Sequence, residues 1–374
     1  MQTLQIGLIS SPVQTSGSDT YFFNLTRALS ELGCGISGLV LGDVSATPTA
    51  LPTVRSFSPE GRSTYARWSG LRRGVRARRA SVDAVVGHFA PHVFPVLDLL
   101  GRKPLIEHFH GPWSLEARAA GLPRPTVLFR AVQERIVYGR ADRIIVLSQY
   151  FGDLLESEFA VPRRKIRVVP GGADLGRFYP ASTRAIERRR LGIEGDRPLL
   201  VCCARLESQK GVAGLIDAMR TVRPIVPHVS LAVLGTGSQR TALEKQAADS
   251  GLRDCVRFLG HADPAMVAAY FRAADFTVVP STGTEGFGLV CIESLACGTP
   301  VLATPVGALP EVLRPLSPHT IAEGTSADAI ARSIGDALTG RVAMPSPEAC
   351  VAYARRFSWT SVARSVLDVY HEVA

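Results

Sequence analysis

The residues with the clearest chemical potential lie at positions 285 to 293, where the sequence reads EGFGLVCIE. Two glutamates, Glu285 and Glu293, flank a Gly-Phe-Gly step that follows the apolar run DFTVVP. We expect a strand to end there and a helix to run from about Gly288 to Cys297. Glycines let the backbone approach a ligand closely, and the free N–H groups at a helix start favour phosphate. The stretch therefore predicts phosphates on the amides and sugar hydroxyls on the two carboxylates.

A second pair of charged residues supports this interpretation. The segment ARLESQKG at the end of another apolar run carries Arg205 and Lys210, five positions apart. Two cations over a diphosphate would neutralise the charge of a leaving group. The plainer alternative stays open for each motif taken alone: solvated glutamates beside a simple turn, and a solvated cationic rim.

Apolar runs and helical patterns alternate along the chain and define the elements that must position these residues. The run LQIGLIS, the helical stretch YFFNLTRALSEL and the run GISGLVLG form a strand–helix–strand unit, the start of a doubly wound sheet. After a charged stretch the pattern restarts near residues 181–197. We expect an α/β protein with two doubly wound, Rossmann-like domains facing across a cleft: residues 1–180, residues 181–357, and a closing helix at 358–374.

Length and composition agree with two ordinary globular domains. The chain has 374 residues, of which 46% are hydrophobic and 20% charged, and no apolar run is long enough to span a bilayer. The start MQTLQIGLISSPVQ is typical of an opening strand and not of a signal peptide. Seven cysteines without a C-x-x-C pair indicate reduced thiols in a cytosolic protein.

The net charge of +9 is unevenly placed, because residues 62–79 carry seven arginines and no acid. Tyr65, Trp68, Leu71 and Val75 recur at helical spacing within this run. A helix of this kind would lie on an anionic membrane or hold a phosphorylated lipid acceptor, and a solvated basic face is the alternative.

Several long segments resemble the retaining glycosyltransferases of family 4, which have the GT-B fold. The resemblance rests on ARLESQKG, LGTGSQ, VRFLGH, PGGADLGRF, FSWTSVARSVLDVY and above all residues 278–312. In that family the first glutamate contacts the transferred sugar and the second the ribose, while an arginine and a lysine hold the diphosphate. The resemblance thus implies roles for Glu285, Glu293, Arg205 and Lys210. It also places the closing helix back on the first domain.

Further site residues follow from the same resemblance. It implies that the backbone at Phe287, Gly288 and Leu289 lines the phosphate and sugar, and that Gly235 lies near the base. In the first half it implies a histidine beside the donor sugar, His110, and an acceptor-side histidine, His88. A structural role remains the alternative for each histidine, and Trp113 is either an acceptor platform or core.

The chain departs from the family pattern at two loops. The first loop has Gly17 alone in place of a glycine pair, so its contact with the donor phosphate or acceptor is an open expectation. The segment before the domain link reads PGGAD, with Gly171 where the family usually has asparagine.

Other protein classes lack their sequence signatures. GTGSQR at 235–240 is the nearest match to a dinucleotide fingerprint, and it lacks the third glycine. The chain has no phosphate-loop, nucleophile-elbow, H-E-x-x-H or D-x-D motif. A non-enzymatic nucleotide-binding protein or a nucleic-acid binder on the same scaffold remains an alternative.

The sequence therefore predicts a retaining hexosyltransferase that needs no metal or other cofactor and binds no nucleic acid. The expected donor is a UDP-sugar, with GDP-mannose next. The acceptor is a saccharide, a lipid-linked group or a small molecule, in cell-surface polysaccharide or glycolipid synthesis, with tailoring of a small natural product as the alternative. We expect a cytoplasmic enzyme, peripheral at the inner face of the cell membrane.

Overall fold

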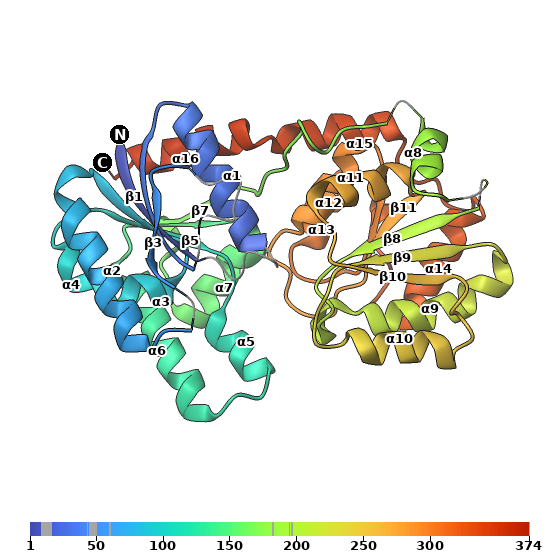
Figure 1. Ribbon diagram of the computed structural model, residues 1–374, viewed down its shortest axis with the longest axis horizontal. Helices are drawn as coiled ribbons and strands as arrows, with labels where there is room; N and C mark the ends of the chain where they lie inside the picture. The colour runs from blue at the N-terminus through green and yellow to red at the C-terminus, as the bar shows by residue number, and fades with distance from the viewer. Residues whose placement is uncertain are drawn as a thin grey trace. The chain divides into compact units, whose positions relative to one another are not determined.

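The chain folds into two compact units in the computed structural model, which describes residues 1–8, 17–42, 44, 51–59, 61–181, 183–193, 195 and 197–373 (Figure 1). The first unit comprises residues 1–172 and 359–374, and the second comprises residues 173–358. The predicted link after residue 180 lies inside the second unit, and the closing helix belongs to the first.

A seven-stranded parallel sheet, among the described residues, forms the centre of the first unit. Its order is β3-β2-β1-β4-β5-β6-β7. The strands are β1 (Gln2–Leu8), β2 (Gly35–Leu41), β3 (Val54–Ser58), β4 (Ala84–Gly87), β5 (Leu105–Phe109), β6 (Arg143–Val146) and β7 (Ile166–Val168). Most are continuous apolar runs because helices cover both faces of the sheet. The short strand β3 was missing from the predicted pattern.

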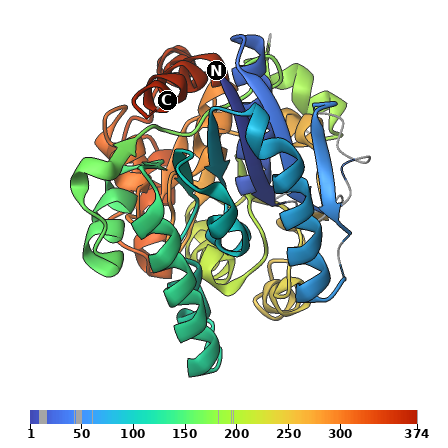
Figure 2. The ribbon, with the colours of Figure 1, turned by 90° about the vertical axis from the view of Figure 1, so that its left-hand side faces the viewer.

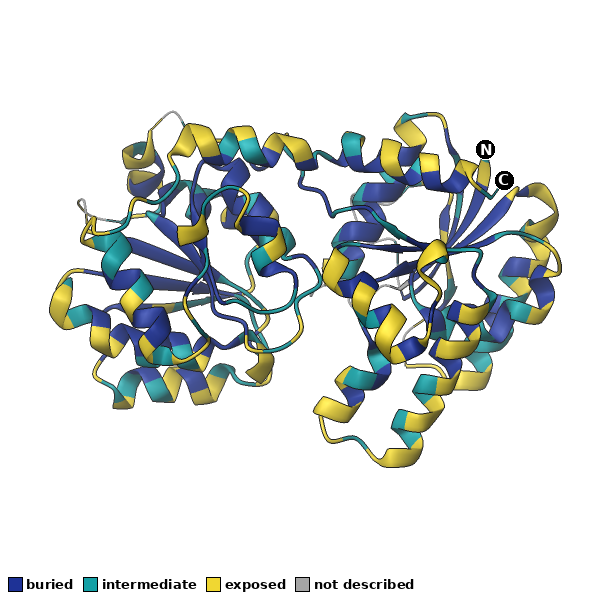
Figure 3. Ribbon diagram, turned by 180° about the vertical axis from the view of Figure 1, so that it is seen from behind, coloured by how far each residue is buried: buried dark blue, intermediate teal, exposed yellow. Residues whose placement is uncertain are grey.

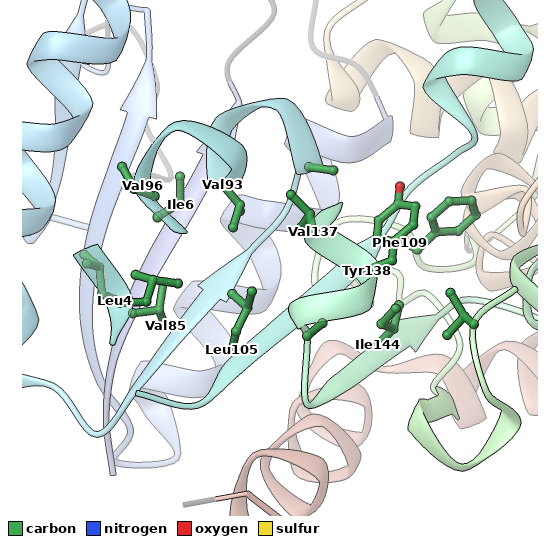
Figure 4. Close-up of a cluster of buried hydrophobic side chains, with 14 of the residues drawn as sticks. Leu4, Ile6, Val85, Val93, Val96, Leu105, Phe109, Val137, Tyr138 and Ile144 are labelled. Atoms are coloured by element: carbon green, nitrogen blue, oxygen red, sulfur yellow. The ribbon is translucent and has the colours of Figure 1, made fainter. Parts of the chain in front are cut away.

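Helices cover both faces of this sheet (Figure 2). They are α1 (Gly17–Glu31), α2 (Thr64–Arg78), α3 (Ala90–Val93), α4 (Leu97–Leu100), α5 (Trp113–Ala119), α6 (Arg124–Arg140), α7 (Gln149–Phe159) and α16 (Trp359–His371). Alternate strand residues enter different cores. Leu105 and Phe109 of β5 pack with α6 residues such as Val137 (Figure 4), whereas Ile106 packs in the cluster that contains α1 and α16.

Helix α2 contains the arginine-rich run; its apolar residues Trp68, Leu71 and Val75 face the unit, whereas Tyr65 is exposed. Leu71 and Val75 are buried in the core, and Trp68 packs against Phe94 with ring centroids 6.2 Å apart. A Cβ at Gly70 would lie 2.2 Å from the carbonyl oxygen of Phe57, so glycine permits this close packing. The protein's own core therefore takes up Leu71 and Val75 and leaves Tyr65 exposed, and the contact of residues 62–79 with a membrane stays a prediction.

The second unit has a five-stranded parallel sheet among its described residues, in the order β10-β9-β8-β11-β12. Its strands are β8 (Leu199–Cys203), β9 (Ser230–Leu234), β10 (Val256–Gly260), β11 (Phe276–Val279) and β12 (Val301–Ala303). Its helices are α8 (Arg184–Arg190), α9 (Val212–Ile225), α10 (Arg240–Asp249), α11 (Pro264–Ala273), α12 (Leu289–Ala296), α13 (Leu309–Leu313), α14 (Ala327–Leu338) and α15 (Pro347–Ala354). All seven cysteines of the chain are free thiols.

Candidate active site

The charged motifs of the second unit meet at the carboxyl ends of two neighbouring strands, β8 and β11. The chain proceeds from β8 to one side of the sheet and returns at β11 on the other side, so the strand order reverses between them. Ligands of open α/β sheets bind at such a reversal. Arg205 and Lys210 follow β8, and Glu285 follows β11.

Backbone contacts hold the two loops together. The carbonyl oxygen of Gln209 accepts hydrogen bonds from the amides of Thr282 and Gly283, at 2.9 and 3.0 Å. Gly211 has φ +68°, and a Cβ there would lie 1.8 Å from the carbonyl oxygen of Pro280. The glycine is thus required for the loops to approach, and this approach brings Lys210 next to Glu285.

The carboxylate of Glu285 is held from two sides. Lys210 Nζ lies 2.5 Å from Glu285 Oε1, and Ser281 Oγ donates to the same oxygen at 2.6 Å. The amide of Ala308 donates to the main-chain oxygen of Glu285 at 2.8 Å. Lys210, which the sequence assigned to the diphosphate, pairs here with the glutamate. Arg205 is exposed. The two cations therefore differ: one orients a carboxylate, and the other extends into solvent.

Helix α12 begins where the sequence placed its helix, after the Gly-Phe-Gly step. Gly288 precedes it with φ +81°, and a Cβ there would lie 2.8 Å from Leu309 Cδ2. The ring of Phe287 is buried against Phe357, with centroids 5.7 Å apart, so only the backbone of Phe287 is available to a ligand. Leu289 is the first helical residue and is partly exposed.

Glu293 has the most perturbed carboxyl pKa of this unit's candidate site. Burial raises its pKa from 4.5 to about 7; the charge of Arg177 opposes this rise and that of Asp174 adds to it. Its neighbour on α12, Ser294, is buried and donates to Thr277 Oγ1 on β11 at 2.8 Å. This bond helps fix the rotation of the helix and thereby the position of Glu293. Arg177 and Asp174 were not among the predicted site residues, and only their place in PGGADLGRF could have drawn attention to them.

The backbone at the end of β9 requires glycine at position 235 for a structural reason. The φ of Gly235 is +132°, and a Cβ would lie 1.9 Å from the carbonyl oxygen of Ala204, just after β8. The residue therefore lets the end of β9 close against the end of β8, next to the loop that carries Arg205.

In the first unit, His110 follows β5 and contacts His88, which follows β4. His110 Nε2 and His88 Nδ1 lie 3.3 Å apart, and the other nitrogen of His88 lies 2.8 Å from Gln5 Oε1. The ring of His88 is 3% exposed and both of its nitrogens have partners. Both nitrogens of His88 are thus engaged within the unit, where the ring can orient His110, and its predicted acceptor-side role stays a prediction.

A wider polar network surrounds this pair. The amide nitrogen of Gln5 donates to Thr3 Oγ1 at 3.0 Å and to Tyr370 OH at 3.4 Å, so its oxygen accepts from His88 Nε2. His88 Nδ1 then accepts from His110 Nε2, and this assigns the tautomer of both rings. Nε2 of His108, a residue of β5, lies 3.0 Å from the hydroxyl of Tyr370 on α16.

All three histidines are neutral at pH 7. Burial lowers the pKa of His110 to about 4. Burial and the neighbouring imidazoles lower the pKa of His88 and of His108 well below the ordinary value. The cluster can therefore hold hydrogen bonds in fixed directions but carries no charge for an anionic ligand.

Trp113 begins α5, three residues after His110, and is partly exposed. The guanidinium of Arg130 lies 3.9 Å from the centre of its ring, and Phe89 packs edge-on at 5.5 Å. The carboxylate of Glu134 accepts from the amides of Trp113 and Ser114 at 2.8 and 3.1 Å, which caps α5. The ring of Trp113 is thus held in place and partly exposed, as a platform for an acceptor would require.

Gly17 is the exposed first residue of α1. The loop before it, residues 9–16, lies outside the described residues. The predicted role of Gly17 at the donor therefore has no described loop to support it.

Sequence reasoning did not select Ser281, Gln5, His108 or Tyr370. A glutamine within the apolar run LQIGL and the HFH spacing around His108 were visible signals. Tyr370 lies 365 positions from Gln5, and no local pattern predicts such a contact.

These features define an α/β protein whose second unit has the arrangement of a nucleotide-binding domain. The family model described as glycosyltransferase family 4 matches residues 15–177, and the one described as glycosyl transferases group 1 matches residues 183–357. A D-inositol 3-phosphate glycosyltransferase of Corynebacterium kroppenstedtii is 34% identical over 321 residues, covering 81% of this chain and 70% of that protein. The chain belongs to this glycosyltransferase family.

Two further proteins are informative. A GDP-mannose-dependent alpha-(1-6)-phosphatidylinositol monomannoside mannosyltransferase of Mycolicibacterium smegmatis is 35% identical over 205 residues, 53% of each chain. The structure of Anabaena HepE in complex with UDP and glucose aligns over 100% of both chains with a TM-score of 0.83 and 19% identity, which shows the shared GT-B fold. The chain spans 60% and 56% of the length of two other relatives named D-inositol 3-phosphate glycosyltransferase, from Corynebacterium jeikeium and Salinispora tropica.

Proposed function

We propose that this protein transfers a hexose from a nucleotide diphosphate sugar to a hydroxyl acceptor with retention of anomeric configuration. The observation that carries the proposal is the Glu285 carboxylate fixed by Lys210 and Ser281 at the strand-order reversal, beside the helix that presents Glu293. A nucleotide sugar offers what this arrangement can bind: two phosphates, a ribose diol and a hydroxyl-rich ring.

Each residue has a distinct part in the proposed reaction. Arg205 and Lys210 neutralise the charge that develops on the departing diphosphate, and the backbone from Phe287 to Leu289 donates to it. Glu285 binds the transferred sugar, and Glu293 accepts the ribose hydroxyls. The departing phosphate takes the acceptor proton, as the family resemblance implies. The family resemblance further implies a contact of His110 with the sugar, and the half-buried ring of Trp113 is proposed as a surface for the acceptor.

Binding of the donor requires Lys210 to serve two partners. In the ligand-free protein its ammonium group pairs with Glu285. An incoming diphosphate adds a second anion, and an ammonium group with three donors can contact both. The cation would then link the sugar-binding carboxylate to the leaving group.

The donor is proposed to be a UDP-sugar, with GDP-mannose as the second candidate, which the name of the mycobacterial relative favours. For the acceptor we propose an inositol-containing glycolipid or its phosphorylated precursor, because the names of both relatives contain inositol. Polysaccharide synthesis and tailoring of a small natural product are the remaining options. A glycolipid acceptor would place the enzyme at the inner face of the cell membrane.

Nucleic-acid binding is not part of the proposal. The argument for nucleic-acid binding depended on the arginine-rich run, and two arginines of that run form contacts within their own unit. Arg72 forms a bidentate pair with Asp98, at 2.6 and 2.7 Å, and Arg79 donates to the carbonyl oxygen of Leu99.

A donor-hydrolysis screen over UDP-glucose, UDP-galactose, UDP-N-acetylglucosamine and GDP-mannose tests the reaction class. We expect one donor to be hydrolysed well above the others, at a rate unchanged by EDTA. Acceptor trials with that donor, read by NMR of the anomeric proton, should give the donor's own configuration. Hydrolysis of no donor, dependence on added Mg²⁺ or Mn²⁺, or an inverted product would contradict the respective part of the proposal.

A further inference from the structure

Helix α6 exposes an unusual number of large apolar side chains. Four of its residues are well exposed: Leu128 (66%), Phe129 (55%), Val132 (44%) and Ile136 (46%). Across the described residues only nine large hydrophobic side chains are so exposed, and the other five are distributed over different elements: Tyr65, Tyr150, Tyr179, Ile225 and Met266. Single exposed apolar residues need no explanation, whereas a cluster marks an interaction surface.

The four residues form one stripe along the helix. Their spacing of one, three and four positions places them on one side, because residues three and four apart are neighbours on a helix surface. The opposite side carries the buried residues Gln133, Glu134, Val137 and Tyr138, which hold α6 against its own unit. Helix α6 therefore buries one side in its unit and exposes an apolar stripe on the other.

This stripe lies on a helix hairpin, α5–α6, that extends away from the sheet of its unit (Figure 1, Figure 2). Exposed residues run along the hairpin in Figure 3. A projecting hairpin can enter a flat surface without interference from the rest of its unit.

The charge around the stripe is positive. Residues 113–140 contain five arginines and two glutamates, and one of these, Glu134, is buried as the cap of α5. Arg118, Arg124 and Arg135 are exposed. Two of the three acids of the adjoining helix α7, Asp153 and Glu156, pair with Arg163, and the third, Glu158, is exposed with its main-chain oxygen accepting from Arg135 at 3.2 Å. An apolar stripe bordered by arginines is the pattern of a helix that lies in a membrane interface.

We propose that the α5–α6 hairpin docks on an anionic lipid surface, with Leu128, Phe129, Val132 and Ile136 inserted among the lipids and the arginines at the headgroups. A second copy of the chain fits this surface less well. An isologous dimer through the stripe would bring the arginines of the two copies together, whereas anionic lipid neutralises them. Among the described residues, no helix combines the length and apolar character that crossing a bilayer requires, so this contact would be interfacial.

The hairpin is continuous with the candidate acceptor residues. Helix α5 begins at Trp113, three residues after His110, and Arg130 of α6 stacks on the ring of Trp113. Docking at this place would therefore bring a lipid-linked acceptor to the part of the unit that carries these side chains. The inference rests on the proposed function only for this consequence; the surface itself does not depend on which sugar is transferred.

Sedimentation of the full chain with vesicles tests the proposal. The vesicles are phosphatidylcholine alone, or phosphatidylcholine with one third phosphatidylglycerol by composition. We expect binding to the anionic vesicles and binding at least about tenfold weaker to the neutral ones, since each arginine near an anionic surface contributes about a fivefold change in partition. The double variant Leu128→Gln with Phe129→Gln should reduce anionic binding about tenfold or more. The variant Arg118→Gln with Arg124→Gln should reduce it by a similar factor.

Two control variants match these changes in chemistry but lie elsewhere. Ile225→Gln with Met266→Gln alters exposed apolar residues of the second unit, and Arg73→Gln with Arg76→Gln alters exposed arginines of α2. Both should bind vesicles as the unaltered chain does. All four variants change exposed side chains, and equal melting temperatures would show that folding is intact.

Two results of the vesicle experiment would contradict the proposal. Absence of vesicle binding by the unaltered chain would overturn the proposal, as would full binding by the Leu128→Gln, Phe129→Gln variant. If that variant instead converted a dimer into a monomer and kept its vesicle binding, the stripe would be a self-association surface. Donor hydrolysis measured without vesicles should be equal in all variants, so failure of the membrane proposal leaves the proposed reaction untouched.

Discussion

The two groups of candidate residues differ in charge and in exposure. In the second unit, Arg205, Lys210 and Glu285 are charged and lie on loops at the strand ends, with Arg205 open to solvent. In the first unit, the cluster around His110 is neutral and mostly buried, and its hydrogen bonds run from His88 to Gln5. The charged arrangement of the second unit can bind an anion and stabilise charge that develops during a reaction. The neutral cluster of the first unit can only direct hydrogen bonds.

This difference predicts how substitutions in each group will act. Loss of a charged group at the donor site should change affinity for a phosphate ligand or stabilisation of the transition state, by large factors. Loss of a member of the histidine network should alter the orientation of one imidazole, by small factors. The following predictions are ordered by the size of the expected effect.

The substitution Glu285→Gln should have the largest effect on turnover. Its carboxylate is fixed by Lys210 and Ser281, and removal of one such preorganised contact lowers kcat by about 10²–10³-fold. Steady-state rates with the preferred donor measure this loss. The variant Ser281→Ala removes a single hydrogen bond to the same oxygen and should lose less. A Glu285→Gln enzyme with unchanged kcat would contradict the role of this residue.

The substitutions Lys210→Met and Arg205→Met should have different kinetic effects. Lys210 both orients Glu285 and meets the diphosphate, so its loss should lower kcat and raise the donor KM together, about 10–100-fold in kcat/KM. Arg205 is exposed and is proposed to contact the phosphate alone, so its loss should be smaller and should appear mainly in the donor KM. Equal effects of the two substitutions would show that the Lys210–Glu285 pair has no catalytic consequence.

Donor binding should depend on pH through Glu293. The pKa of its carboxyl is about 7 in the free protein, and only the ionised form presents both oxygens purely as acceptors to the two ribose hydroxyls. The donor KM should therefore be constant above pH 7 and rise about tenfold per unit as pH falls below 7. The variant Glu293→Gln should show a raised KM without this pH dependence. A KM of the unaltered enzyme that is flat from pH 5 to 8 would contradict ionisation of Glu293 as the cause.

Glu293 should also make the stability of the folded protein depend on pH, with lower stability at higher pH. Because the pKa of Glu293 is higher in the folded protein than in the unfolded chain, folding loses stability as pH rises from about 4.5 to about 7. Glu293→Gln removes this loss. Its melting temperature should exceed that of the unaltered chain at pH 8 by a few degrees, and the two should converge at pH 4.5. Convergence at pH 8 instead would mean that the carboxyl is not stabilised in its neutral form.

The smallest effect is expected in the histidine network. Gln5→Leu removes the acceptor for His88 and should lower kcat about three- to tenfold with little change in donor KM, because it acts on His110 through one intervening ring. Thr3→Val is the matched control, since Thr3 contacts Gln5 and no histidine among the described contacts. NMR of the imidazole nitrogens should show a changed tautomer of His110 in Gln5→Leu only. An unchanged tautomer with reduced kcat would point to a structural cause.

The sequence predicts the strands and the helix start around Glu285 better than the histidine network, for a physical reason. The strands and the glutamate–glycine motif are local, since apolar runs of four to seven residues and a glycine before a helix each report on their own backbone. The pairing of Lys210 with Glu285 and the bond between Gln5 and Tyr370 depend on how distant segments pack. The inward face of α2 illustrates the same limit, because an amphipathic pattern does not say whether the apolar side meets a core or a membrane.

Calorimetric titration of the free nucleotide diphosphate, UDP or GDP according to the preferred donor, tests the central assignment most directly. A bare nucleotide carries the ribose and phosphates but no sugar. The account predicts that Glu293→Gln weakens its binding about tenfold. It predicts that Glu285→Gln keeps or slightly strengthens binding, because the substitution frees Lys210 for the phosphates. Loss of nucleotide binding in Glu285→Gln together with full binding in Glu293→Gln would show that the donor lies on this helix in the reverse direction.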